Sequence, residues 1–104
     1  MPVTEIAGHV LHVDDEGFLT ELAEWDEDVA RGLAAQIGIE LTGKHLELLR
    51  FLRADFAVRG ETATTRRVQA VGGVPVKEQF ALFPVKPAKK MAYVAGLPKP
   101  HGCV

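Results

Sequence analysis

Glycine and proline interrupt the second half of this chain so often that only short helices can form there. The longest uninterrupted amphipathic segment is residues 42–59, and Gly60 follows it as a typical helix end. Proline lacks the amide hydrogen that a helix interior uses. Pro84 must therefore end one helix, whereas Pro75 and Pro87 suit the first turn of the next. These breaks predict several short helices around one longer helix.

Apolar residues recur at helical spacing between the breaks. Val29, Leu33 and Ile37 lie four residues apart within 26–37, where Asp26 is placed to cap the first turn. In the segment 42–59 the apolar stripe consists of His45, Leu48, Leu49, Leu52 and Phe56, and we interpret the histidine as a hydrogen-bonded core residue. Further short helices are expected within residues 62–73, 76–83 and 88–95.

A β-hairpin is expected before the helices, from His9 to Leu22. "VLHV" is apolar and β-prone, "DDEG" supplies a turn with Gly17, and "FLTEL" returns. A lone hairpin is marginal in water, so it must pack on the helices, and Trp25 is expected to anchor the following helix. The predicted fold is mostly α (α+β), with one domain over residues 1–95 and a flexible C-terminal arm over 96–104.

The composition fits one soluble domain. The chain has 104 residues, of which 47% are hydrophobic and 25% charged. No run approaches the roughly 20 apolar residues of a membrane span, and the N-terminus lacks the pattern of a signal peptide. A single cysteine cannot form an internal disulfide. We therefore expect a cytoplasmic protein with no membrane partner.

Charge is unevenly distributed along the chain. Residues 1–30 carry nine acidic residues and no lysine or arginine, whereas residues 79–104 carry four lysines and no acid. One interpretation of this pattern is two solvated faces of opposite charge. The other is a basic C-terminal end that favours a thiolate and tolerates anions.

The C-terminal residues 95–104 read "AGLPKPHGCV" and contain the only cysteine, Cys103. Pro98 and Pro100 prevent a helix and favour an extended, polyproline-like path. At about 3.1 Å per residue, such a path carries the sulfur roughly 20 Å beyond Gly96. One interpretation is an arm that inserts a thiol into a partner's site. The other is a disordered terminus with an incidental cysteine.

This tail resembles the C-terminal signature of the DsrC/TusE family, which ends in a penultimate cysteine after a Gly-Leu-Pro-Lys-Pro run. Colinear blocks extend the resemblance over nearly the whole chain: "DDEGFL", Trp25, "GIELTGKH", "FLR" and "LFPVKPAKK". The resemblance implies a β-hairpin on an orthogonal helical bundle with a mobile C-terminal arm. It also implies that Cys103 carries sulfur as a persulfide, or as a disulfide or trisulfide with a partner.

Two branches of the family differ in their thiols. DsrC-like members carry a second cysteine on the last helix and work with dissimilatory sulfite reductase, whereas TusE-like members relay sulfur toward tRNA thiolation through one thiol. Ala92 occupies the second position here, which favours a one-thiol carrier. Leu46, where the family often has Trp, and the altered stretch 61–79 depart from the pattern, so partner choice is expected to differ.

The implied partners are a sulfur donor resembling TusBCD or DsrEFH and an acceptor resembling a tRNA thiolase or a sulfite reductase, with nucleic acid only indirectly involved. No cofactor is implied. The chain would be a sulfurtransferase-type covalent carrier rather than a stand-alone catalyst. An alternative role is a DsrC-like subunit of a sulfite-reductase or heterodisulfide-reductase-like complex.

The thiol must react as a thiolate, and an ordinary cysteine pKa of about 8.5 leaves little thiolate at neutral pH. Nearby cations would increase that fraction, and Arg66 and Arg67 are candidates for contacting the arm or a bound anion. Cys103 with His101 supplies two metal ligands where zinc needs about four, so no metal is expected. The arm and tuning residues are Gly96, Leu97, Pro98, Lys99, Pro100, His101 and Gly102.

A nucleic-acid-binding module is the alternative from another class. The segments 26–37 and 42–59 are joined by a short turn, as in helix-turn-helix proteins. The second segment carries Lys44, Arg50, Arg53 and Arg59. The net charge of −2 and the pI of about 6.1 weigh against this alternative.

Overall fold

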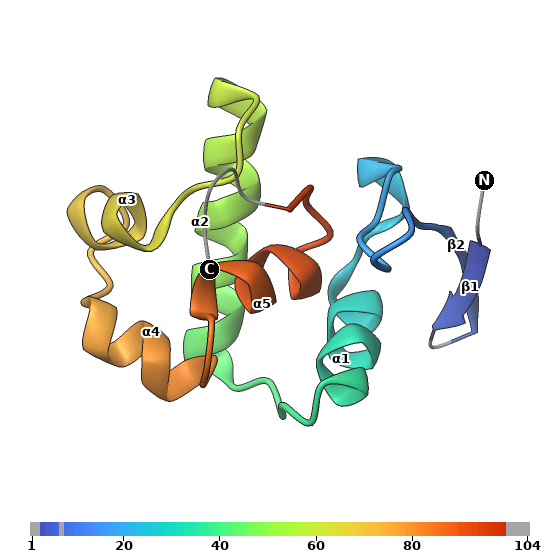
Figure 1. The fold of residues 1–104 in the computed structure, drawn as a ribbon, viewed down its shortest axis with the longest axis horizontal. Coiled ribbons are helices and arrows are strands. Elements are labelled where there is room, and N and C mark those ends of the chain that lie inside the picture. Colours follow the sequence, from blue (N-terminus) through green and yellow to red (C-terminus); the bar gives the residue numbers. More distant parts are fainter. Residues whose placement is uncertain (1–2, 7, 100–104) are drawn as a thin grey trace.

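A computed structural model describes residues 3–6 and 8–99, where five α-helices follow a two-stranded antiparallel hairpin (Figure 1). The strands are β1 (Val3–Ile6) and β2 (His9–His12), and a 3-10 turn, η1 (Leu22–Glu24), leads into the helices. The helices are α1 (Glu27–Gln36), α2 (Gly43–Arg59), α3 (Thr65–Ala70), α4 (Val76–Leu82) and α5 (Pro87–Val94). The predicted mostly helical fold with an N-terminal hairpin is confirmed.

The pairing within the hairpin differs from the prediction. The strand His9–His12 forms, but its partner is Val3–Ile6 rather than the returning segment 18–22. Only one bridge, between Val13 and Leu19, joins β2's continuation to that segment. The predicted partner strand was therefore wrong, although the predicted strand 10–13 was placed nearly correctly.

Side-chain hydrogen bonds explain why the second pairing stops. The Asp14 carboxylate accepts from the backbone N–H of Phe18 at 2.9 Å, and Gly17 adopts a φ of 88°, so the predicted turn does form. Beyond it, the Glu24 carboxylate accepts the backbone N–H of His12 at 2.8 Å. This hydrogen bond lowers the pKa of Glu24. It also occupies the His12 N–H, which a longer strand pairing with segment 18–22 would need as a donor.

The helix ends follow the sequence signals. Asp26 caps α1 by accepting from the N–H of Val29 at 2.8 Å, and Thr42 precedes α2. Gly60 ends α2 with a φ of 72°, in the left-handed region that glycine adopts at little cost. Both predicted boundaries of the longest helix are confirmed.

His45 is a buried, hydrogen-bonded core residue, as predicted. Its Nδ1 accepts from the backbone N–H of Thr42 at 3.0 Å, and its Nε2 lies 2.8 Å from the carbonyl oxygen of Leu82. Because a backbone amide can only donate, Nδ1 carries no proton and Nε2 donates. The ring thereby ties the start of α2 to the end of α4.

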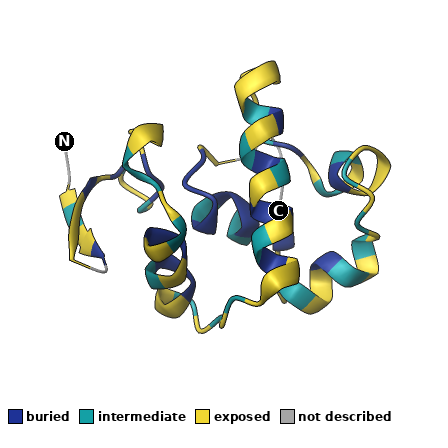
Figure 2. Cartoon of the chain, turned by 180° about the vertical axis from the view of Figure 1, so that it is seen from behind, coloured by how far each residue is buried: buried dark blue, intermediate teal, exposed yellow. Residues whose placement is uncertain are grey.

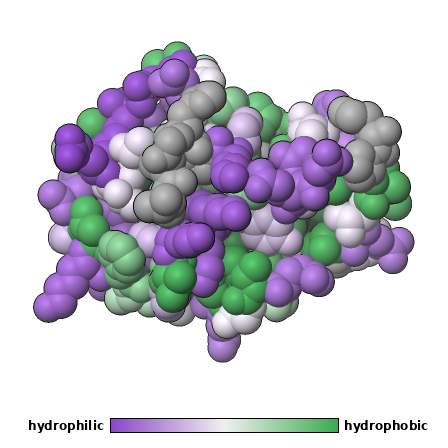
Figure 3. Space-filling model, in the orientation of Figure 1, coloured by the Kyte–Doolittle hydropathy of each residue, from purple (hydrophilic) through white to green (hydrophobic). Residues whose placement is uncertain are grey.

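Helix α5 is the central element. It contacts α1, α2 and α4, and its residues are among the most buried in the molecule (Figures 1 and 2). Met91 and Val94 of α5 belong to the larger of two apolar clusters, and Trp25 and Tyr93 pack against both clusters. The predicted anchoring role of Trp25 is confirmed. On the surface, apolar residues form small groups between hydrophilic ones (Figure 3).

Within the described residues, no helix combines the length and the apolar character that crossing a membrane requires.

Candidate functional site at the base of the C-terminal arm

Backbone hydrogen bonds at the end of α5 fix the path of the residues that follow the helix. The N–H of Gly96 donates to the Tyr93 carbonyl at 3.3 Å, and the N–H of Leu97 donates to the Ala92 carbonyl at 3.0 Å. With Gly96 at a φ of 70°, these bonds form a Schellman cap. Two of the four carbonyls at the helix end are thus satisfied by the backbone that follows.

Two side chains from distant segments satisfy the other two carbonyls. Trp25 Nε1 donates to the Val94 carbonyl at 2.8 Å, and Arg53 Nη1 donates to the Ala95 carbonyl at 2.8 Å. The Arg53 guanidinium also lies 4.4 Å from the Trp25 ring centroid, within cation–π range. Burial lowers the pKa of Arg53, but a guanidinium stays protonated in proteins, so a cation lies at the negative end of the helix dipole.

Gly96 and Leu97 belong to the packed core. A Cβ on Gly96 would lie 2.5 Å from Trp25 Cδ1 and 2.8 Å from Leu19 Cδ1, so only glycine fits. Leu97 is 1% exposed and joins the larger apolar cluster. The packing therefore continues two residues past 95, the predicted end of the domain.

The next two residues, Pro98 and Lys99, are each held by a contact with a segment distant in the sequence. Thr62 Oγ1 donates to the Pro98 carbonyl at 2.7 Å, and Lys99 Nζ donates to the Glu16 carboxylate at 3.1 Å. Lys99, predicted to tune the thiol, is thus paired with an acid from the N-terminal segment. The other predicted site residues of the arm lie outside the described residues: Pro100, His101, Gly102 and Cys103.

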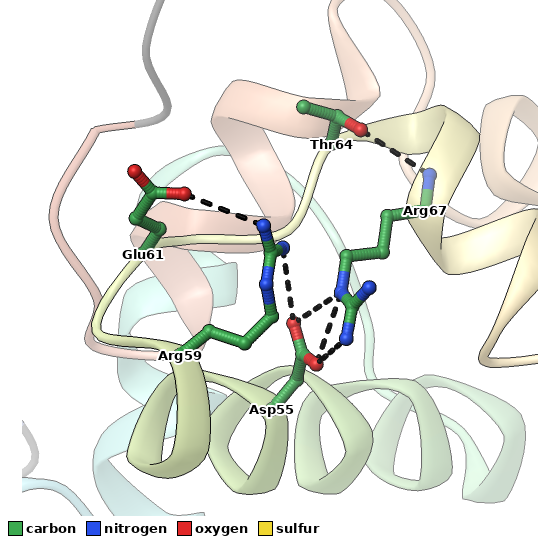
Figure 4. Close-up of polar contacts among 5 residues, drawn as sticks. All are labelled: Asp55, Arg59, Glu61, Thr64 and Arg67. Atoms are coloured by element: carbon green, nitrogen blue, oxygen red, sulfur yellow. Dashed lines mark hydrogen bonds and ion pairs between the residues drawn. The ribbon is translucent and has the colours of Figure 1, made fainter.

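A cluster of charged side chains lies between α2 and α3 (Figure 4). Arg67 donates through Nε and Nη2 to the Asp55 carboxylate, with the shortest distance 2.6 Å, while Arg59 reaches both Asp55 and Glu61. The hydrogen bonds from Arg67 hold the pKa of Asp55 below its ordinary value, and the same bonds raise the pKa of Arg67. Thr64 caps α3 by accepting from the Arg67 N–H. Arg67 therefore joins two helices.

A hollow of about 430 Å³ opens beside this cluster. Thr62, which binds the Pro98 carbonyl, lines the hollow, so it adjoins the base of the arm. Arg66 is exposed on its rim and forms no ion pair with another residue in the described part of the chain. Contact of Arg66 or Arg67 with the arm or an anion stays a prediction.

The sequence interpretation missed Glu16, Arg53 and Thr62, which bind residues 95–99, and it missed Asp55, which pairs with Arg67. Only Asp55 gave a signal, because it follows Leu52 by three residues and so lies on the apolar stripe of α2. An acid on such a stripe requires a buried partner, which Arg67 supplies. Arg53 and Thr62 bind backbone carbonyls, and no sequence pattern identifies such contacts.

The fold and this site define a small helical protein whose C-terminal segment leaves from a firmly held helix end. A family model described as "DsrC like protein" matches residues 5–104. The chain belongs to this family, and the resemblance found in the sequence is confirmed.

Relatives and solved structures agree with this assignment. The chain is 37% identical to sulfurtransferase TusE of Salmonella typhimurium over 93% of this chain and 95% of the relative. The NMR structure of Allochromatium vinosum DsrC superposes with a TM-score of 0.81 at 36% identity, covering 98% of this chain and 97% of that one. The oxidized γ-subunit of dissimilatory sulfite reductase (DsrC) from Archaeoglobus fulgidus gives 0.79 at 37% identity, covering 99% and 100%.

Proposed function

We propose that this protein is a cytoplasmic sulfur carrier that holds sulfane sulfur as a persulfide on Cys103. The observation that carries the proposal is the position of the only cysteine in the sequence, six residues beyond Leu97, which is the last buried residue in the described part of the chain. Six extended residues span about 20 Å at most, so a thiol there can enter a partner's site while the core stays outside. The name of the TusE relatives, sulfurtransferase, supports this chemistry.

The loading step is an exchange between sulfur atoms. The Cys103 thiolate attacks the outer sulfur of a donor persulfide, forming a new S–S bond as the donor's S–S bond breaks. The donor leaves as a thiolate, and no net oxidation occurs. Unloading repeats the same step, with an acceptor thiolate attacking the outer sulfur on Cys103. Because each step needs only a thiolate and a persulfide, no cofactor is required.

The single thiol determines how sulfur leaves. Ala92 is fully buried in α5, at the position where the family resemblance places a second cysteine in DsrC-like members. With one cysteine, no disulfide can form within the chain, so sulfur must pass to another molecule. We propose a donor resembling TusBCD or DsrEFH and, as endpoint, formation of 2-thiouridine in tRNA.

A subunit of a sulfite-reductase-like complex is a second candidate role. The structural match to the γ-subunit of dissimilatory sulfite reductase from Archaeoglobus fulgidus favours it. Such a subunit would use the same arm and the same thiol, so the two roles differ only in the partner.

The basic residues of α2 weigh against direct DNA binding. Arg50 pairs with Glu27 at 2.7 Å, and Lys44 lies 3.6 Å from Glu78. Arg53 is committed to backbone carbonyls at the end of α5. These side chains are engaged within the fold, whereas a recognition helix needs them for phosphates and bases.

Loading is tested by intact mass after incubation with a small-molecule persulfide. The wild type should gain about 32 Da per sulfur atom and lose it on reduction, and Cys103→Ala should gain nothing. A gain that persists in Cys103→Ala would overturn the proposal. The endpoint is tested by measuring tRNA 2-thiouridine in cells lacking the chain. Its restoration by the wild type but not by Cys103→Ala supports the tRNA role, and no loss on deletion would favour the complex subunit.

A further inference from the structure

A second hollow, of about 380 Å³, lies where the turn before α5 faces the N-terminal segment. We name it the lysine-rimmed hollow, and its lining residues are Glu16, Phe18, Ile37, Val85, Lys86, Lys89, Lys90 and Tyr93. Four of these are apolar or aromatic and three are lysines. The charged cluster between α2 and α3 contributes no residue to it.

The floor of this hollow is a fixed aromatic pair. Phe18 and Tyr93 pack edge to face with ring centroids 5.7 Å apart, and burial raises the pKa of the Tyr93 hydroxyl. At the rim, Val85 is 67% exposed and has a φ of 60°, in the left-handed region that β-branched residues avoid. An apolar side chain is thus held toward solvent beside an apolar floor.

The positive charge at the rim is not neutralised within the described structure. Lys86 and Lys89 form no ion pair with any described residue, and Lys90 Nζ binds the Pro84 carbonyl instead of an acid. The one acid lining the hollow, Glu16, is paired with Lys99 at 3.1 Å. The N-terminal end of α5 adds the positive pole of its helix dipole.

We propose that the lysine-rimmed hollow docks an acidic segment of a partner protein that inserts one apolar or aromatic side chain. The lysines supply charge complementary to the acidic segment, and burial of the inserted side chain against the apolar floor stabilises the complex. The volume falls in the range of small binding pockets, about 300 Å³ and above. The Glu16–Lys99 contact connects this hollow to the base of the arm, so a partner docked here lies beside the segment that leads to Cys103.

A protein partner fits these features better than a nucleic acid. Single-stranded nucleic acids bind on exposed aromatic faces, whereas Phe18 is only 2% exposed and its ring offers no open face on which a base could stack. The inference rests on the proposed function only for the identity of the partner as a sulfur donor or acceptor.

Binding is tested by NMR titration of the full chain with the peptide acetyl-Glu-Asp-Phe-Asp-Glu-amide. We expect shift changes at residues 85–93 and at Phe18, and weaker binding at higher salt. Lys89→Glu should raise the Kd about threefold or more, while the matched reversal Lys77→Glu, on α4 away from the hollow, should leave it unchanged. Peptides with Lys for the acids, or with Ser for Phe, should bind more weakly.

The inference would be overturned if the lysine peptide bound as tightly as the acidic peptide, or if Lys77→Glu weakened binding as much as Lys89→Glu. Shift changes confined to residues outside the lysine-rimmed hollow would also overturn it. So would tighter, Lys89-dependent binding of a short single-stranded RNA. Loading of Cys103 from a small-molecule persulfide should be the same in Lys89→Glu as in the wild type. If the wild type is not loaded by the persulfide, the proposed function fails but this inference stands. If the wild type does not bind the acidic peptide, this inference fails but the proposed function stands.

Discussion

Replacing Gly96 by alanine tests how firmly the base of the arm is held. The new Cβ would lie 2.5 Å from Trp25 Cδ1, and Trp25 cannot move away freely because its Nε1 is bonded to the Val94 carbonyl. The φ of 70° adds backbone strain, since a residue with a Cβ avoids this region.

The loss of folding free energy caused by Gly96→Ala can be approximated from these two effects. The left-handed backbone costs roughly 1–2 kcal/mol, and forcing an extra carbon into a packed site typically costs about 1–3 kcal/mol. The sum is about 2–5 kcal/mol, which at roughly 4–8 °C per kcal/mol lowers the melting temperature by at least about 8 °C. Thermal unfolding followed by circular dichroism measures this shift.

Gly38→Ala is the matched control. Gly38 follows α1 with a φ of 73°, but a Cβ there meets nothing within 4 Å, so only the backbone strain applies. Gly96→Ala should therefore lower the melting temperature clearly more than Gly38→Ala. Equal shifts in the two variants would refute the reasoning, because they would show that contact with Trp25 and Leu19 costs nothing.

Three further predictions concern Asp55, Trp25 and Cys103. Hydrogen bonds from Arg67 hold the pKa of Asp55 below its ordinary 3.8, so this carboxylate stabilises the fold above that pH, and the contribution is lost as pH falls through the lowered pKa. Asp55→Asn should therefore lower the urea midpoint at neutral pH and approach the wild type in acid, and a deficit independent of pH would contradict this. Trp25→Phe should cost about 2 kcal/mol in urea unfolding, because it leaves the Val94 carbonyl without its donor, and an unchanged midpoint would show that bond to be dispensable. Cys103→Ala should change the free energy of unfolding by less than about 0.5 kcal/mol, and a large fall in melting temperature would mean that the thiol packs in the core.

Local signals predicted the helices well. Asp26, Thr42 and Gly60 act within one helical turn of their own position, and the structure confirms each boundary. The stripe of α2 and the core role of His45 also follow from spacing alone. Such features depend only on residues within a few positions of each other, so they can be predicted from the sequence.

Long-range pairing could not be predicted in the same way. Segment 3–6 pairs with β2 along its whole length, whereas the pairing with segment 18–22 stops after one bridge because Glu24, twelve residues away, accepts the His12 amide. The base of the arm also depends on a long-range contact, because Arg53 donates to the Ala95 carbonyl 42 positions further along the chain. The arm was predicted to begin at 96, but the burial of Leu97 depends on helices brought together only in the fold.

The central claim is that Cys103 holds the transferred sulfur. The most direct measurement is the mass of the C-terminal peptide, released by proteolysis under non-reducing conditions after loading with a persulfide labelled with a heavy sulfur isotope. We predict that the labelled sulfur is found on the peptide containing Cys103 and is released when an acceptor thiol is added. Label on another peptide, or no label under conditions in which the donor is consumed, would contradict the claim.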